Sequence, residues 1–162
     1  MLFSSLPAYV SLADGRSLSV EKIPSHAFKS LHAIELAAHS HPMSEKLFSE
    51  NIERYHALAI KLDGEWIGFS LISLVVGEAE LLDYVVDPKL QGQGIGRAFL
   101  DWIVSELSKS AERFYLEVRA SNHPAIALYD AVGFSEMGIR SNYYPAKKGR
   151  EDAVLMAMEL FA

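Results

Sequence analysis

A glycine-rich loop is the first segment whose residue types can do chemistry. It consists of Gln91, Gly92, Gln93, Gly94, Ile95, Gly96 and Arg97, between an expected strand and an expected amphipathic helix. Glycines let the backbone approach a ligand closely and leave N–H groups free at a helix N-terminus. Those donors, together with the positive end of the helix dipole, suit a pyrophosphate. The loop predicts a phosphate-binding site, and the alternative is a tight turn that merely uses glycine.

Two common phosphate-binding loops are excluded by the residues present. A Walker loop requires Gly-Lys-Ser/Thr, whereas this chain has Gly96, Arg97 and Ala98 in that place. A dinucleotide fingerprint of the GxGxxG type fails because Arg97 stands where its last glycine belongs and because the loop falls late in the chain.

Two side chains farther along have the chemistry for proton transfer. Glu117 lies mid-strand between Leu116 and Val118 and points to the opposite face from them. A carboxylate there can act as a general base, directly or through one water. The alternative is a carboxylate paired with Arg119 on the same face. Tyr129 lies on the inward stripe of a helix, where a tyrosine commonly packs in the core with its hydroxyl hydrogen-bonded.

The hydrophobic pattern places these residues in an α/β fold, an α+β mixed sheet three layers thick. The expected strands are 17–23, 56–62, 65–76, 80–86, 113–119, 134–142 and 153–160. The expected helices are 25–39, 44–48, 97–107 and 123–132. These seven strands and four helices follow the order β-α-α-β-β-β-α-β-α-β-β, and Asp63-Gly64 predicts a hairpin turn between two of the strands.

Composition excludes several classes of function. Fifteen Lys and Arg against 21 Asp and Glu give a net charge of −6, which argues against nucleic acid as a partner. The absence of cysteine excludes disulfides, thiolate metal sites and a cysteine nucleophile. The longest apolar stretch, Trp66 to Val76, is too short to span a bilayer, and the N-terminus lacks a basic targeting region. We expect a soluble cytoplasmic protein with no membrane partner.

The glycine loop is one of several blocks by which the sequence resembles the GNAT superfamily of N-acetyltransferases. It matches the pattern Gln-x-x-Gly-x-Gly at Gln91, Gly94 and Gly96. The further blocks are Leu116–Asn122, Ala127–Tyr129, Gly133–Phe134, Asn142–Pro145 and Gly149–Ala153. Together they resemble the RimI-type ribosomal-protein-alanine N-acetyltransferases over about Ser25 to Leu160, and the expected element order matches that fold.

The resemblance implies one N-acetyltransferase domain over residues 1–162 with a GNAT-like three-layer fold. Residues 1–16 are expected to be an N-terminal extension of unknown role. It implies acetyl-CoA as co-substrate and no metal ion. The residues expected to bind acetyl-CoA are Tyr84, Val85 and Val86 at a strand end, Gln91, Gly92, Gln93, Gly94, Ile95, Gly96 and Arg97 in the loop, and Asn122. The side chain of Asn122 can also cap the helix that follows it.

The same resemblance assigns roles in the reaction. It makes Glu117 the base and Tyr129 the acid that protonates the leaving thiolate, and it places Tyr143 and Tyr144 beside the acceptor. The histidines His39 and His41 have no further metal ligand nearby in the sequence and are interpreted as a solvated helix end.

The implied acceptor is a protein N-terminal α-amine, that of a ribosomal protein with N-terminal alanine, which attacks the thioester directly. A basic ribosomal protein suits an enzyme of net charge −6, and a monomer is compatible with the sequence. One departure concerns the acceptor side, where Met43 replaces a tryptophan of the family's Pro-Trp-Ser segment.

The alternative functions are acetylation of a small amine (a polyamine, an amino acid or an antibiotic) and a non-catalytic acyl-CoA-binding module. The presence of both Glu117 and Tyr129 counts against the second alternative.

Overall fold

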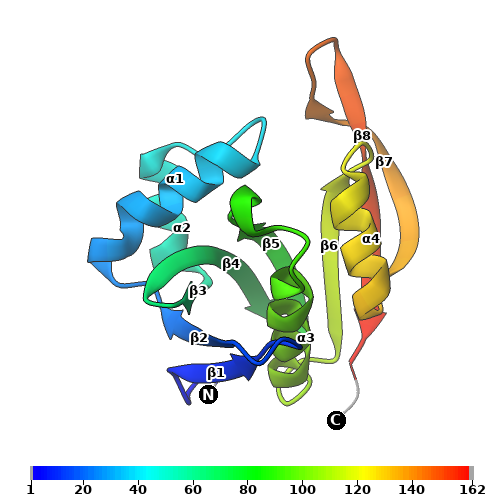
Figure 1. Cartoon of the computed structure of the whole chain (residues 1–162). Helices are drawn as coiled ribbons and strands as arrows, with labels where there is room; N and C mark the ends of the chain where they lie inside the picture. The colour runs from blue at the N-terminus through cyan, green and yellow to red at the C-terminus, as the bar shows by residue number, and fades with distance from the viewer. Residues whose placement is uncertain (1, 161–162) are drawn as a thin grey trace.

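Eight strands form a single sheet in the computed structural model, which describes residues 2–160 (Figure 1). The strands are β1 (Ala8–Ser11), β2 (Ser17–Lys22), β3 (His56–Leu62), β4 (Glu65–Val75), β5 (Glu78–Val86), β6 (Arg113–Arg119), β7 (Ser135–Pro145) and β8 (Arg150–Glu159). The α-helices are α1 (Phe28–Ala38), α2 (Glu45–Arg54), α3 (Ile95–Leu107) and α4 (His123–Val132). The strand order is β1-β2-β3-β4-β5-β6-β8-β7.

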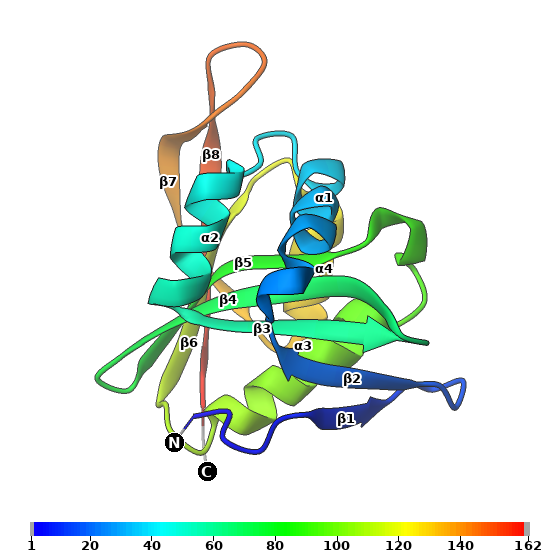
Figure 2. The ribbon, with the colours of Figure 1, turned by 90° about the vertical axis from the view of Figure 1, so that its left-hand side faces the viewer.

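The helices cover both faces of the sheet, which makes three layers (Figure 2). Helices α1 and α2 lie on one face, where Phe48 packs against Phe69 with ring centroids 5.1 Å apart. Helices α3 and α4 lie on the other face over a larger core that contains Phe99, Phe114 and Phe134. Burial of such aromatic side chains is a main source of stability in a fold of this size. The predicted α/β class and its three layers are confirmed.

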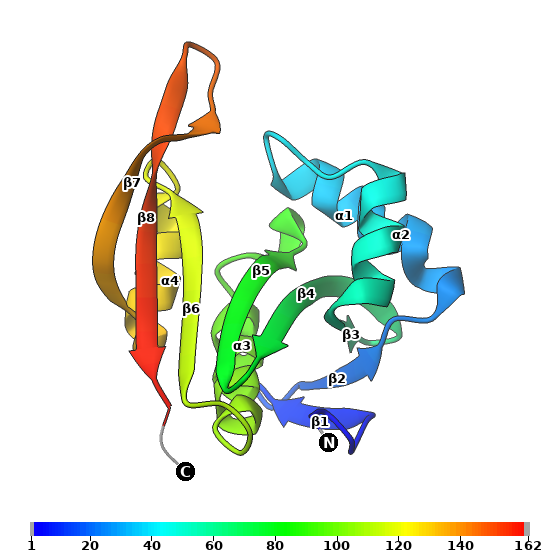
Figure 3. The ribbon, with the colours of Figure 1, turned by 180° about the vertical axis from the view of Figure 1, so that it is seen from behind.

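The parallel pairing of β5 with β6 is short. Residues Glu78–Leu81 pair with Arg113–Leu116, whereas the other neighbouring strands pair antiparallel. Both strands continue beyond this point, β5 to Val86 and β6 to Arg119, and they diverge toward their C-terminal ends (Figures 1 and 3). The sheet therefore has a gap between two central strands, into which side chains from both layers can reach.

Several elements begin or end one to three residues from their predicted bounds, and two differ more. The sheet of residues 2–160 has eight strands rather than seven, because Ala8–Ser11 pairs antiparallel with β2 across a turn at Gly15, whose φ is +91°. This strand lies within the first sixteen residues, and its four residues are too few to show a clear alternation. Helix α2 runs to Arg54 rather than ending at Phe48, since Ile52 continues the apolar face one turn later. Within residues 2–160 no helix is long and apolar enough to cross a membrane.

Candidate active site

A cavity of about 440 Å³ opens beside the diverging end of β5. It is bounded by β5, the glycine loop, the first turns of α4 and the end of α1. The predicted site residues that line it are Tyr84, Val85, Val86, Gln91, Gly92, Gly94, Ile95, Gly96, Arg97, Asn122 and Tyr129. The predicted residues outside its lining are Gln93, Glu117, Tyr143 and Tyr144. The cavity thus brings together most of the residues expected around a phosphate-bearing ligand.

The loop presents free backbone donors to the cavity. Gly92 and Gly94 have φ of +79° and +81°, the left-handed region in which glycine is unstrained. A Cβ atom at either position would meet nothing within 4 Å, so the space beside them is open. Gly94 is the N-cap of α3, and within the described chain no side chain caps this helix. The first-turn amides of α3 are therefore available to an anionic ligand.

Two side chains hold the loop in place. The hydroxyl of Tyr84 donates a hydrogen bond to the carbonyl oxygen of Gly96, and burial raises the pKa of Tyr84 well above its usual value. Gln93 turns away from the cavity, and its Oε1 accepts a hydrogen bond from Arg16 at 3.1 Å. The N-terminal hairpin thus supports the loop, and Gln93 serves this contact rather than the cavity.

Helix α4 contributes its cap and a buried tyrosine. The side chain of Asn122 accepts from the backbone N–H of Ala125 at 3.3 Å, which confirms the predicted cap. Tyr129 is buried and lines the cavity. Its burial, followed by the nearby charge of Asp83, raises the pKa of the Tyr129 hydroxyl. The hydroxyl therefore stays protonated throughout the neutral range, as a proton donor requires.

Glu117 lies on β6 on the opposite face of the sheet from Tyr129. Its neighbours Leu116 and Val118 pack in the core under α3 and α4, so its side chain faces the side of α1. The carboxylate forms an ion pair with Arg140 of β7, with Nη2 and Oε1 3.2 Å apart. The alternative pairing with Arg119 is wrong, because Arg119 is engaged by β8.

Arg119 and Arg140 also order the two predicted acceptor-side tyrosines. Arg119 forms an ion pair with Glu151 at 2.9 Å, and its guanidinium lies 4.6 Å from the ring centroid of Tyr144. The guanidinium of Arg140 lies 4.8 Å from the ring centroid of Tyr143. Both tyrosines belong to β7, which continues beyond its predicted end at residue 142, and burial raises the pKa of Tyr144 to about 12. They lie on the Glu117 side of the gap.

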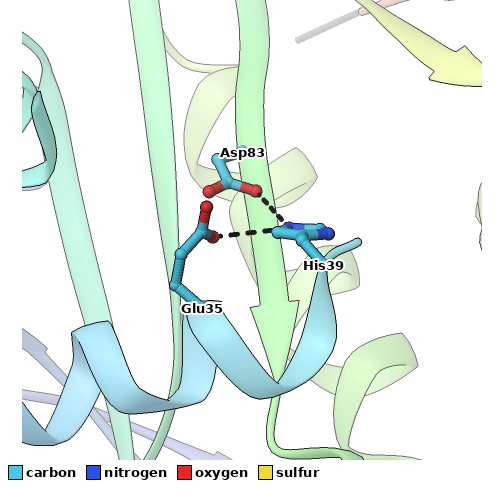
Figure 4. Close-up of side chains that lie close together, drawn as sticks. All are labelled: Glu35, His39 and Asp83. Atoms are coloured by element: carbon cyan, nitrogen blue, oxygen red, sulfur yellow. Dashed lines mark hydrogen bonds and ion pairs between the residues drawn. The ribbon is translucent and has the colours of Figure 1, made fainter. Parts of the chain in front are cut away.

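Sequence reasoning missed a polar cluster at the end of α1, formed by Glu35, His39 and Asp83 (Figure 4). The Nε2 atom of His39 lies 2.9 Å from Oδ1 of Asp83 and 3.4 Å from Oε1 of Glu35. His39 is therefore not a solvated helix end. Glu35 and His39 are four residues apart on one helix face, a spacing the sequence does show. Their contact with Asp83 on β5 requires the tertiary fold.

Glu35 is the most unusual member of this cluster. Only 2% of the residue is exposed, and its Oε2 accepts the backbone N–H of Met43 at 2.9 Å. Burial, and then the neighbouring side chain of Asp83, raises the pKa of Glu35 to about 8. The hydrogen bond with Asp83 raises the pKa of His39. Near pH 7 Glu35 is therefore mainly protonated, and Nε2 of His39 is hydrogen-bonded to Asp83 beside it.

A divided parallel strand pair and an uncapped helix N-terminus open onto one cavity, an arrangement that suits an extended ligand with phosphate groups. Residues 23–134 match the acetyltransferase (GNAT) family model, and the chain belongs to this family. It is an N-acetyltransferase, and the family uses acetyl-CoA. The resemblance seen in the sequence blocks is thus confirmed.

Several characterised relatives cover most of the chain. The [ribosomal protein bS18]-alanine N-acetyltransferase of Escherichia coli (strain K12) is 46% identical over 129 residues, 78% of this chain and 87% of that protein. The Haemophilus influenzae enzyme of the same name is 38% identical over 144 residues, 87% of this chain and 98% of that protein. The crystal structure of the Escherichia coli ribosomal-protein-S18-alanine N-acetyltransferase superposes with a TM-score of 0.83 at 41% identity, covering 90% and 95% of the two chains.

The raised pKa of Glu35 predicts that the folded state loses stability as the pH rises. Between the ordinary carboxyl pKa, about 4.3, and about 8, the folded protein keeps a proton that the unfolded chain has released. The slope is at most about 1.4 kcal/mol per pH unit. Glu35→Gln keeps an acceptor for Met43 and removes the titration. Its Tm relative to wild type should therefore increase from pH 5 to pH 8 in thermal melts, whereas exposed Glu50→Gln should show a constant difference. A constant difference for Glu35→Gln would contradict the neutral carboxyl.

The phosphate site predicts a charge-specific effect at Gly94. Gly94→Asp puts a carboxylate at the N-terminus of α3 and should abolish the rise in Tm that acetyl-CoA causes, which for wild type corresponds to about 2.7 kcal/mol at a ligand concentration of 100 Kd. Gly94→Asn is the matched control, since Asn and Asp both tolerate positive φ and both cap helices well. The Asn variant should retain more of the rise in Tm. Equal rises in wild type and Gly94→Asp would mean that the loop is only a turn.

Proposed function

We propose that this enzyme transfers the acetyl group of acetyl-CoA to the N-terminal alanine of ribosomal protein bS18. The observation that carries the proposal is the 46% identity to the Escherichia coli enzyme named for that reaction, over 87% of that enzyme. The sequence blocks Asn142–Pro145 and Gly149–Ala153, which resemble the same family, lie in the β7–β8 region. The reaction places the enzyme in the cytoplasm, where ribosomal proteins are made.

The cavity residues fit acetyl-CoA. The open space at Gly92 and Gly94 and the uncapped N-terminus of α3 suit its pyrophosphate. Beyond Leu81 the backbone of β5 is no longer paired with β6, so its polar groups can bind the amides of the pantetheine arm. Acetyl-CoA supplies the activated acetyl group when bound.

Glu117 and Tyr129 are the proposed catalytic side chains. Glu117, on the face of α1, accepts a proton from the acceptor amine. Tyr129, on the face of α4, holds the proton that the leaving sulfur requires, because burial keeps its hydroxyl neutral. The gap between β5 and β6 connects the two faces of the sheet at this point. The acceptor therefore enters from the α1 side, past Tyr143 and Tyr144.

The acceptor is tested with peptides and small amines. A peptide that begins with alanine followed by a basic residue should be acetylated on its α-amine. At pH 7.5 the α-amine has about 10²-fold more neutral form than a lysine side chain, because its pKa is about 2.5 units lower. Mass spectrometry of the free peptide, of the same peptide with a blocked N-terminus, and of spermidine identifies the products. Products only on lysine or spermidine would overturn the acceptor assignment.

The two catalytic residues are tested by isosteric variants. Glu117→Gln should lower kcat for the α-amine by about 10² or more while the Kd of acetyl-CoA stays unchanged, since a general base contributes roughly 10²–10⁴. Tyr129→Phe removes only the hydroxyl and should lower kcat in the same range. The matched control is Glu21→Gln, a half-buried carboxyl of β2 outside the cavity. Wild-type turnover in Glu117→Gln at pH 7 would remove Glu117 from the mechanism.

A further inference from the structure

The imidazole of His39 is a group with acid–base chemistry that the proposed roles leave unused. It stands at the C-terminus of α1 with about a third of its side chain exposed, and it lines the same cavity as Tyr129. The carboxyl groups of Glu35 and Asp83 behind it are 2% and 13% exposed. Figure 4 shows both carboxyl groups directed at the same edge of the imidazole ring.

The contacts of the ring select one tautomer. Because Oδ1 of Asp83 accepts from Nε2 at 2.9 Å, the hydrogen sits on Nε2 and the lone pair is on Nδ1. Within residues 2–160, Nδ1 has no hydrogen-bond partner. An imidazole held at one nitrogen by a carboxylate, with the other nitrogen free, is an arrangement suited to accepting a proton.

His39 lies across the gap from Glu117. Asp83 lies two residues beyond Leu81, the last residue of β5 that pairs with β6, and Glu117 directly follows Leu116, the last residue of β6 that pairs with β5. Both side chains face α1, because the cluster is built on that helix and Glu117 points away from the core under α3 and α4. An amine that reaches the gap from this side therefore has a proton acceptor on each wall.

A second acceptor lets the enzyme use the ammonium form of the amine directly, because two protons must leave the nitrogen during the reaction. An α-amine with a pKa of about 7.7–8.0 arrives near pH 7 mainly as the ammonium ion, with three hydrogens on nitrogen. The amide product of an N-terminal amine keeps one. Two protons leave the nitrogen, and one proton goes to the leaving sulfur. Glu117 alone accounts for one of the two, and one of its oxygens is already held by Arg140.

We propose that His39 accepts the first proton, from the ammonium ion, and that Asp83 and Glu35 position its ring. This inference rests on the proposed function. The ammonium nitrogen gives one proton to Nδ1 of His39 and becomes a neutral amine. The N–C bond then forms and the C–S bond breaks, while the nitrogen gives its second proton to Glu117 and the sulfur takes the proton of Tyr129. One net proton is released to solvent.

The charges around His39 fit this role. Asp83 on β5 and Glu35 on α1 favour the protonated imidazole, whereas burial and Arg119 on β6 oppose it, and the net effect raises the pKa of His39. The reference pKa of an imidazole, about 6.5, already lies far closer to that of an α-amine than a carboxylate does. On α4, Tyr129 experiences the charge of the same Asp83.

The test is the pH dependence of turnover in His39→Gln. We expect kcat at pH 7 to fall about 10- to 100-fold, with the KM of the acceptor and the Kd of acetyl-CoA nearly unchanged. Above the pKa of the amine the first proton is already gone, so turnover should approach that of wild type by about pH 9.5. The matched control is His32→Gln, a half-buried histidine of α1 whose Nε2 contacts the carbonyl of Met43 outside the cavity. It should keep the wild-type profile.

Two further measurements separate this role from others. Asp83→Asn keeps an acceptor for Nε2 but removes the charge, so it should lower the pKa of His39 in an NMR titration and move the acid limb of the pH profile to lower pH. With a lysine-type amine of pKa about 10.4, the recovery of His39→Gln should move to above pH 10. The pH at which His39→Gln regains wild-type turnover thus depends on the pKa of the amine that the wild-type enzyme accepts. If the acceptor is a different amine, this pH shifts with its pKa; if His39 has no role in proton transfer, no recovery occurs with any amine.

Three outcomes would overturn the proposal. A loss in His39→Gln that is constant from pH 6 to pH 10 would indicate a structural role. A rise in KM alone would make the cluster a binding site for the ammonium ion. Loss of wild-type activity in a chelator, restored by Zn²⁺, would mean that the three side chains hold a metal ion.

Discussion

The early end of the β5–β6 pairing is the constraint on which the site depends. Only Glu78–Leu81 and Arg113–Leu116 are paired, and beyond them two central strands lie side by side without a common hydrogen-bond ladder. Unpaired backbone groups inside a protein are costly unless water or a ligand satisfies them. The amide groups of a pantetheine arm would supply such partners, which is why the proposed acetyl-CoA site lies at this irregularity in the sheet.

The gap is kept open by contacts on both faces of the sheet. On one face, α1 ends against β5 through the His39–Asp83 pair. On the other, Asn122 starts α4 directly after β6, and Tyr129 packs edge-to-face against Phe134 with ring centroids 5.8 Å apart. Each contact also places a group that can exchange protons at the edge of the gap. The elements that hold the strands apart are therefore those that carry the proposed chemistry.

Local patterns in the sequence predicted much of this arrangement, because local interactions produce it. Strands β3 and β6 have their predicted bounds, and the cap at Asn122 is where the helix-start signal lies. Burial of Glu35 and its contact with Asp83 join α1 to β5, and the pairing of Glu117 with Arg140 depends on β7. Nothing in the spacing of either pair indicates that contact. The missed first strand is likewise stabilised by its partner β2 more than by its own residues.

One carboxylate links the two halves of the proposed chemistry. The hydrogen bond with Asp83 and its charge raise the pKa of His39 on one side of β5, and on the other side burial, followed by the charge of Asp83, raises the pKa of Tyr129. The first effect makes the imidazole a stronger base, and the second keeps the Tyr129 hydroxyl protonated, so that its proton is available to the leaving sulfur. Glu35, kept neutral by burial, adds no second negative charge that would compete for the same imidazole near pH 7. Burial of Glu35 lowers the stability of the folded protein above the ordinary pKa of a carboxyl, because the folded state keeps a proton that the unfolded chain releases. In return, Asp83 is the carboxylate whose negative charge acts on both His39 and Tyr129.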